Sequence, residues 1–331
     1  MLNKSIKIIE KLQYPTGLFA ASATSVKTGY NMAWLRDNVY TAIGLEAAKK
    51  KVALRKTFHA LLDVLLKHEF KIDHAIKEKP KHHFQYIHAR YDPITMDEIW
   101  EEWGNKQNDA IGAILFKIGE LEEKKIKIVR SNDDKRILQK LVNYLENIEY
   151  WHDKDNGMWE ENEEIHASSV GACVAGLKKI SKIVHVKKSL IEKGQKTLDK
   201  LLPNESVTKE VDLALLSLIY PYNVVSQKQK KQILDNVEQK LVRNMGTIRY
   251  INDQYYFRKG EAQWTMGFPW LAIIYRKMKN KRKYAFYAQK TTDVMNENHE
   301  LPELYFADGS GYNENCPLAW SQALYVASLK D

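Results

Sequence analysis

Apolar residues recur every three to four positions along almost the whole 331-residue chain. That period places the apolar side chains on one face of a helix. The pattern predicts twelve helices, over residues 3–12, 37–50, 53–70, 107–121, 133–150, 166–181, 185–201, 209–218, 226–241, 264–278, 280–297 and 317–329. Short polar side chains that can accept a hydrogen bond from a first-turn N–H group mark candidate helix starts, at Asp37, Asn108, Asp109 and Ser168.

Strand-like segments are few and short. The best of them, residues 246–257, fits either a hairpin or an extended loop. Because strands and helices do not alternate, neither a doubly wound sheet nor a TIM-type barrel is expected. The chain is therefore predicted to be all-α.

No linker or low-complexity block divides the chain, so we expect one domain over residues 1–331. Twelve helices suit six hairpins closed in a ring, the (α/α)6 toroid, while an open superhelical array of helix pairs has a similar pattern. Loops rich in aromatic, acidic and amide residues favour the toroid, because loops that carry chemistry are placed on a rigid scaffold. They span residues 15–36, 79–106, 151–165, 244–263 and 299–316.

Composition and charge narrow the classes of partner. Hydrophobic residues make up 44% of the chain and charged residues 28%, which is typical of a soluble globular protein. The formal net charge is +9, but the lysines are scattered over many segments, so we expect no nucleic-acid site. The absence of any run of 18 apolar residues predicts no membrane span. Cys173 and Cys316 are too few for a disulfide framework and favour a reduced, cytoplasmic chain.

Two polar clusters contain the residue types found in metal sites, but the spacing of these residues along the chain does not match a known metal-binding pattern. Structural zinc patterns are not matched by His74, His82, His83 and His88. The calcium-loop template is not matched by Asp308, Asn313 and Glu314. Because no phosphate-loop or dinucleotide-binding motif appears either, the sequence predicts no metal and no cofactor.

The eight tryptophans lie mostly at predicted helix starts or in loops, beside acids and amides. Examples are WLRD at 34–37, WEEN at 159–162 and AWSQ at 319–322. Aromatic faces pack against the C–H faces of sugars, while acids and amides bond sugar hydroxyls. Ordinary packing at helix ends would give a similar distribution, so a carbohydrate site is one of two interpretations.

Glycoside hydrolysis requires two carboxyl groups, one that protonates the leaving oxygen and one that activates water or attacks carbon. An apolar aromatic wall favours the protonated form of the first. Two Trp-Glu-Glu segments offer such a wall, at residues 100–102 and 159–161. Composition does not choose between them.

Six ordered motifs carry a resemblance that covers nearly the whole chain. They are GLFAASATSVKTGYNMAWLRDNVY, HARYD with WGNKQNDAIGAIL, GMWEENEEIHASSVGACVAGL, LLPNESVTKEVDLALLSL, GTIRYINDQYYFRKGEAQW and LPELYFADGSGYNENCPLAWSQAL. Together they resemble glycoside hydrolase family 15, the glucoamylase family, and the related N-terminal domain of the phosphorylase kinase α and β subunits. The resemblance implies an (α/α)6 toroid and an inverting, exo-acting hydrolase. Its substrate would be an α-glucan, a gluco-oligosaccharide or a related α-glucoside, and its product β-glucose.

Matched position by position, the resemblance implies Glu160 as general acid and Glu303 as general base. The remaining implied residues bind substrate. Trp34, Arg36 and Asp37 would hold the sugar at the cleavage point, with Tyr30 facing the developing positive charge, and the mouth would be lined by Trp103, Gln107 and Asp109. Further sugar contacts would come from Trp159, Glu161, Arg249, Tyr250 and Trp320.

An inverting site places its two carboxyls about 6.5–9.5 Å apart with water between them. We further expect Arg36 and Arg249 to keep Glu303 or Asp37 ionised through their positive charge.

Departures from the family pattern leave a second function open. The family's base segment continues E-Q-Y-D, whereas this chain has ELYFAD, similar to the LPELY segment of the kinase subunits. The N-terminal β-sandwich and the starch-binding module of other members are not expected in this chain. The alternative is a non-catalytic carbohydrate-binding or regulatory domain.

Overall fold

The computed structural model describes residues 1–101 and 104–330. Within these ranges the chain forms thirteen α-helices. Their bounds are α1 Leu2–Lys11, α2 Leu35–Ala47, α3 Lys51–Lys67, α4 Glu69–Lys77, α5 Asn108–Glu123, α6 Asn132–Asn147, α7 Ala167–Ile180, α8 Lys188–Leu201, α9 Leu216–Ile219, α10 Gln227–Lys240, α11 Gly267–Lys277, α12 Lys281–Asp293 and α13 Ala319–Lys330. Short elements complete the described part: the 3-10 helices η1 His83–Gln85 and η2 Leu213–Leu215, and the strands β1 Ala33–Trp34, β2 Arg90–Tyr91, β3 Gln263–Trp264 and β4 Leu304–Tyr305.

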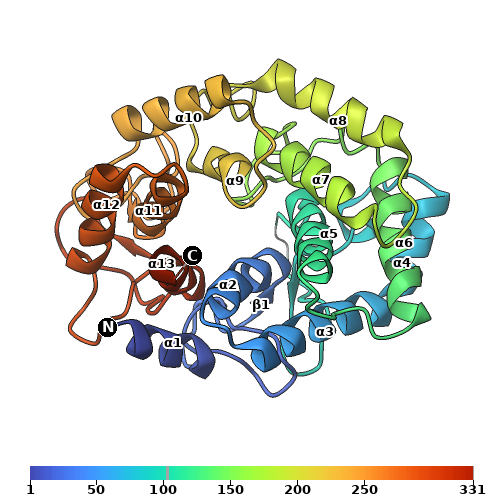
Figure 1. The fold of residues 1–331 in the computed structure, drawn as a ribbon, viewed down its shortest axis with the longest axis horizontal. Coiled ribbons are helices and arrows are strands. Elements are labelled where there is room, and N and C mark those ends of the chain that lie inside the picture. The colour runs from blue at the N-terminus through green and yellow to red at the C-terminus, as the bar shows by residue number, and fades with distance from the viewer. Residues whose placement is uncertain (102–103, 331) are drawn as a thin grey trace.

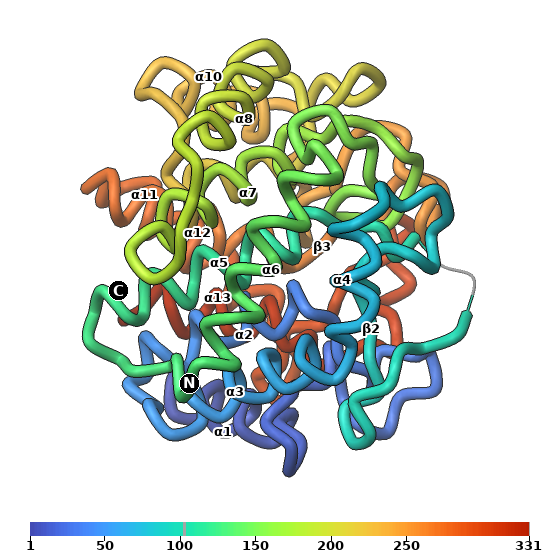
Figure 2. The backbone as a smooth tube through the Cα atoms, turned by 90° about the vertical axis from the view of Figure 1, so that its right-hand side faces the viewer, coloured from blue at the N-terminus to red at the C-terminus, as the bar shows by residue number. Residues whose placement is uncertain are grey.

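The helices are arranged in two concentric rings (Figure 1). In the inner ring, each of α2, α5, α7, α9, α11 and α13 contacts the next, and α13 returns to α2, so the ring is closed. Outside it, α1, α3, α6, α8, α10 and α12 pack on the inner helices, and α4 lies beside α6 (Figure 2). The predicted (α/α)6 toroid is confirmed, and an open array of helix pairs is ruled out by the contact between α13 and α2.

The two rings differ in how their residues are buried. Every residue of α2 from Leu35 to Leu45 is buried, because an inner helix has protein on all sides. Helix α1 instead buries one face that carries Ile6 and Ile9 and exposes its lysines. None of the helices among the described residues has both the length and the apolar character that crossing a bilayer requires.

Small residues bring the inner helices α5 and α7 close together. A Cβ atom on Gly112 would lie 2.4 Å from the carbonyl carbon of Ala172, and one on Gly176 would lie 2.5 Å from the backbone oxygen of Gly112. No larger residue fits at either position without a shift of backbone. This tight packing fixes the relative positions of the loops that lead into the two helices.

Most predicted helices agree with the structure to within a few residues, with two exceptions. The helix predicted over 53–70 ends at Lys67, and α4 extends the helical region to Lys77. The helix predicted over 209–218 is wrong, because the helical residues are Leu213–Ile219, in η2 and α9. Asp212 caps η2 by accepting a hydrogen bond from the Ala214 N–H group, and the residues before it run as a loop.

The predicted helix starts are displaced as well. Helices α2, α5 and α7 begin after Trp34, Gln107 and His166, and none of the three has a side-chain cap. The candidate starting residues lie in the first turns instead, at Asp37, Asn108, Asp109 and Ser168. Their polar side chains are therefore available for tertiary contacts at the end of the toroid.

Residues 246–257 form an extended loop rather than a hairpin. Isolated bridges join Thr247 to Trp264 and Tyr250 to Asp212. Strand β1 pairs antiparallel with β2, and β3 pairs antiparallel with β4. These short pairings tie loop 15–36 to loop 79–106, and loop 244–263 to loop 299–316, on one end of the ring.

Candidate active site

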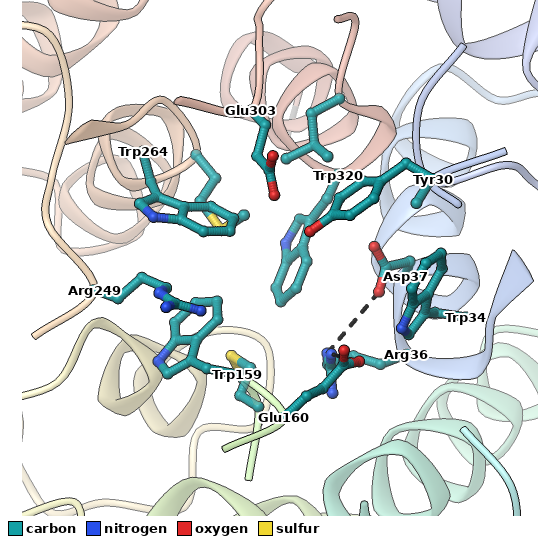
Figure 3. A pocket seen from close by; sticks show the side chains of 14 residues that line it. Tyr30, Trp34, Arg36, Asp37, Trp159, Glu160, Arg249, Trp264, Glu303 and Trp320 are labelled. Atoms are coloured by element: carbon teal, nitrogen blue, oxygen red, sulfur yellow. Dashed lines mark hydrogen bonds and ion pairs between the residues drawn. The ribbon is translucent and has the colours of Figure 1, made fainter. Parts of the chain in front are cut away.

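A pocket lies at the end of the toroid where inner helices begin (Figure 3). Trp34 immediately precedes α2, Met266 precedes α11, and Leu318 precedes α13. The pocket contains about 440 Å³ of space when the part open to solvent is included. Its lining residues are Ala21, Tyr30, Trp34, Arg36, Asp37, Met158, Trp159, Glu160, Arg249, Trp264, Met266, Glu303, Leu318 and Trp320.

Two glutamates lie on opposite sides of this pocket (Figure 3). Glu160 comes from the loop before α7, and Glu303 from the segment that leads into β4. The Glu160 backbone has a φ of 63°, a left-handed conformation that costs a residue with a side chain about 1–2 kcal/mol. Glu303 is fully buried, whereas the Glu160 side chain is 11% exposed. Two carboxyl groups from distant loops thus share one cavity.

Glu303 is held by hydrogen bonds at one carboxyl oxygen. The side-chain amides of Asn313 and Asn315 both donate to Oε2, the latter over 2.8 Å. The other oxygen, Oε1, is buried and accepts no hydrogen bond from the described residues. Burial raises the pKa of Glu303, and the Tyr30 hydroxyl, the two amides and the Arg249 charge offset only part of the rise.

Arg36, at the start of α2, fixes the position of Glu160. Its Nη2 lies 3.4 Å from Glu160 Oε1, and its Nη1 donates to Gln107 Oε1 over 2.7 Å and lies 3.3 Å from Asp109 Oδ2. Gln107 in turn donates to Glu160 Oε1 over 2.8 Å. The last Arg36 donor, Nε, has no hydrogen-bond acceptor among the described residues.

Asp37 turns its carboxyl into the pocket beside Arg36 (Figure 3). Asp37 Oδ2 is 4.0 Å from Arg36 Nε. Burial nevertheless raises the pKa of Asp37 to about 7, and neighbouring carboxylates add to the rise. Arg36 lowers the pKa of Asp37 and Arg249 lowers that of Glu303, in the expected direction, but burial outweighs both cations and the two pKa values are raised.

Aromatic rings form much of the wall. The Trp159 ring centroid lies 5.8 Å from that of Trp264 and 6.3 Å from that of Trp320. On the other side, the Tyr30 and Trp34 centroids are 5.3 Å apart. The indole nitrogens of Trp264 and Trp320 are buried and donate to no acceptor in the described part of the chain.

Glu161 belongs to a charged cluster at the edge of the pocket. It accepts hydrogen bonds from the Tyr250 hydroxyl over 2.7 Å, from Arg249 Nη2 over 3.0 Å and from Lys209 Nζ over 2.5 Å. Glu161 and Glu160 both line a neighbouring groove. The cluster therefore holds Arg249 in the main pocket.

Most of the site residues predicted from the sequence line this pocket, namely Tyr30, Trp34, Arg36, Asp37, Trp159, Glu160, Arg249, Glu303 and Trp320. Glu161 and Tyr250 lie beside it in the charged cluster. Gln107 and Asp109, expected at the mouth, are buried behind Arg36. The predicted residue Trp103 falls outside the described residues.

Several residues of the site were not predicted. Trp264 stands in AQWTM, beside an amide like the other tryptophans, so its signal was present in the sequence. Asn313 stood out only for a calcium-like pattern, and Asn315 carried no signal. Asp212, which accepts the Trp159 indole N–H over 2.7 Å, comes from a segment that the helical period assigned to a helix.

Residues 1–101 and 104–330 contain no group of three or more His, Cys, Asp or Glu side chains placed to hold a metal ion. Both cysteines are free thiols, with Cys173 buried and Cys316 partly buried. The pocket is lined by carboxyl groups, two guanidinium groups and aromatic rings.

Comparison with known proteins gives a consistent result. The sequence model described as Glycosyl hydrolases family 15 matches residues 1–329. The chain is also similar to the probable phosphorylase b kinase regulatory subunit alpha of Drosophila melanogaster, with 26% identity over 94% of this chain and 30% of that protein. The chain thus spans less than a third of the length of the curated relatives it matches.

Two solved structures share the fold. A glycosidase variant in complex with glucose is 18% identical, with a TM-score of 0.84 over 99% of this chain and 94% of that chain. A bacterial glucoamylase complexed with acarbose is 16% identical, with a TM-score of 0.73 over 98% of this chain and 54% of that chain. At these identities the similarity establishes the toroid and leaves the reaction to be argued from the pocket.

Proposed function

The chain belongs to the glycosyl hydrolases of family 15, and from that premise we propose that it is an inverting, exo-acting glycoside hydrolase. The observation that carries the proposal is the pair of Glu160 and Glu303 on opposite sides of one aromatic pocket. The substrate is the end of an α-1,4-linked gluco-oligosaccharide or a related α-glucoside, and the product is β-glucose.

Glu160 acts as the general acid and Glu303 as the general base. The Glu160 carboxyl gives its proton to the glycosidic oxygen while the bond between that oxygen and the anomeric carbon breaks. A water molecule forms the new bond to the anomeric carbon from the opposite face and gives a proton to Glu303. One water is consumed, the configuration inverts, and the two carboxyls return to their starting protonation states through solvent.

The polar atoms of the pocket suit a sugar ring. Three buried donors and one buried acceptor have no hydrogen-bond partner among the described residues: Arg36 Nε, Trp264 Nε1, Trp320 Nε1 and Glu303 Oε1. Buried polar groups are normally paired. Sugar hydroxyls both donate and accept, so they suit the carboxyl and guanidinium groups that line the pocket, while the C–H faces of the ring pack on the aromatic wall.

Proteins of the same fold support a glucose-type ligand. One of the similar glycosidases is a complex with glucose, and the similar bacterial glucoamylase is a complex with acarbose. These ligands belong to those proteins. The pocket of this chain offers paired carboxyls and aromatic rings to a neutral ligand, for which the net charge of +9 is no obstacle.

A second candidate is a non-catalytic carbohydrate-binding or regulatory domain. It is favoured by the similarity to proteins named as kinase regulatory subunits and by Leu304, which follows Glu303 where the hydrolase pattern has glutamine. The retention of both carboxyls in the pocket favours the enzyme over this candidate.

The decisive experiment is a hydrolysis assay with maltose, maltotriose, isomaltose and trehalose between pH 4 and pH 8. We expect the wild-type protein to release glucose, with β-glucose appearing first by proton NMR. Glu160→Gln and Glu303→Gln keep the size of the side chain but replace the carboxyl that transfers the proton by an amide. Each is expected to lower kcat at least about 100-fold. Glu101→Gln, from the other Trp-Glu-Glu segment, is the matched control and should retain activity.

Two outcomes would contradict the proposal. Binding of maltose in calorimetry without glucose release from any of the four sugars would favour the binding domain. Wild-type rates in Glu160→Gln or Glu303→Gln would refute the assigned roles even if hydrolysis occurs.

A further inference from the structure

The segment that follows β4 returns antiparallel to the segment that carries Glu303. The Glu303 N–H group donates to the Asn315 backbone oxygen over 2.9 Å, and the Asn313 N–H group donates to the Leu304 oxygen over 3.3 Å. This pairing places the side chains of Asn313 and Asn315 next to the Glu303 carboxyl. Both asparagines are almost fully buried.

Both asparagine amides donate to the same carboxyl oxygen of Glu303, Oε2. A carboxylate oxygen only accepts hydrogen bonds, so the NH2 groups of the amides must face it. Behind them, the Thr28 hydroxyl donates to Asn315 Oδ1 over 2.5 Å and fixes the far end of that amide. No described donor lies within hydrogen-bond distance of Oε1, although the Tyr30 hydroxyl is close enough to help lower the pKa of Glu303, and Glu303 lines the pocket.

We propose that Asn313 and Asn315 are positioning residues which clamp Oε2 of Glu303 and so define Oε1 as the atom that takes the proton from water. The inference rests on the proposed function and adds residues to it. Two fixed donors on one oxygen prevent rotation of the carboxyl, because a turn about χ3 would break both hydrogen bonds. They also stabilise the ionised form that a general base requires.

The clamp acts against a strong opposing effect. Burial raises the pKa of Glu303, and the amides are two of the groups that lower it. The other charged or titratable groups that interact with this carboxyl are Tyr30, Tyr255, Tyr256, Arg249 and Asp37. Of these groups Tyr256 also interacts with the Asn313 side chain, so Asn315→Ala is the variant in which a change in the titration of Glu303 reports on an amide alone.

The test compares wild type with Asn313→Ala, Asn315→Ala and the double variant. The titration of Glu303 is followed by 13C NMR in protein labelled at the glutamate carboxyl carbon, with the signal assigned from Glu303→Gln. A hydrogen bond to a charged group is strong enough that each lost amide should raise the pKa of Glu303 by about one to two pH units. The acidic limb of the pH profile of kcat/KM on maltose should move up by the same amount.

Two further variants keep the result interpretable. Asn298→Ala, at an exposed asparagine between α12 and β4, is the matched control and should leave the titration unchanged. If the alanine variants do not fold, Asn313→Asp retains the shape and replaces the donor by an acceptor. It should raise the pKa of Glu303 further than Asn313→Ala.

The titration of Glu303 tests the clamp, and the hydrolysis of sugars tests the proposed hydrolase. An unchanged Glu303 titration in folded Asn313→Ala and Asn315→Ala overturns the clamp, whatever the activity. A shifted titration in a protein that hydrolyses none of the sugars supports the clamp and refutes the proposed hydrolase.

Discussion

Replacement of Asp37 by asparagine should stabilise the folded protein at neutral and alkaline pH, and the gain should depend on pH in a defined way. Burial raises the pKa of Asp37 from 3.8 to about 7 in the folded state. Between these values the unfolded chain releases the proton while the folded protein keeps it, so the free energy of unfolding falls by about 1.4 kcal/mol per pH unit. The ionised carboxyl therefore costs about 4 kcal/mol above pH 7.

Asparagine has the shape of the protonated carboxyl and no proton to lose. Urea unfolding of wild type and Asp37→Asn should give nearly equal free energies at pH 4 and a difference that grows to about 4 kcal/mol in favour of the variant at pH 8. Taking the difference between the two proteins cancels the titration of groups that they share. A difference that does not change with pH, or a variant less stable at pH 8, would refute the account of Asp37. Maltose binding should weaken in the same variant, because a sugar-facing carboxylate is lost.

Other predictions test the surroundings of the pocket. Lys71→Met leaves Glu98 buried without its 2.6 Å ion-pair partner and should cost about 3–5 kcal/mol in urea unfolding, whereas the double replacement by methionine should recover much of the loss. His166 is buried with its pKa raised to about 9, so His166→Gln should lose about 3 kcal/mol at pH 6 relative to wild type and almost nothing at pH 10. Glu160→Gly should be more stable than Glu160→Ala by about 1 kcal/mol in urea, because the backbone there has a φ of 63°, and equal stabilities would show that the conformation is unstrained.

The helices were predictable because helical period is a local property of the sequence, whereas the closed toroid was inferred from the loops and from the family resemblance. The predicted helix boundaries are wrong where a polar side chain makes a tertiary contact instead of capping its own helix. Asp37 and Asp109 are residues typical of helix caps, yet Asp37 faces the pocket and Asp109 contacts Arg36 behind it. Asp212 similarly delays the start of the helix predicted over 209–218, because it caps η2 and accepts the Trp159 indole N–H.

Prediction of the site depended on loop motifs, and it named only the residues for which the resemblance implies a role. The resemblance identified Glu160 and Glu303, but the sequence does not state what surrounds each carboxyl. Asn313 and Asn315 reach Glu303 through the antiparallel return of the chain after β4, which is held by one isolated bridge and a few backbone hydrogen bonds that no periodicity reveals. The pKa of Asp37 was likewise misjudged, because the cation beside it is visible in the sequence and its burial is not.

Three features of the pocket each reduce the stability of the fold, and their coincidence favours catalysis over simple binding. Glu160 has a left-handed backbone, Glu303 has a buried oxygen without a partner, and Asp37 has a raised pKa. Backbone strain and displaced pKa values cluster at functional sites. A domain that only bound a neutral sugar could use amides and hydroxyls, which are far less costly to bury than carboxyl groups. The closed inner ring, buried on all sides, supplies the stability that offsets these losses, and two of the three residues concerned are those to which the proposed function assigns proton transfer.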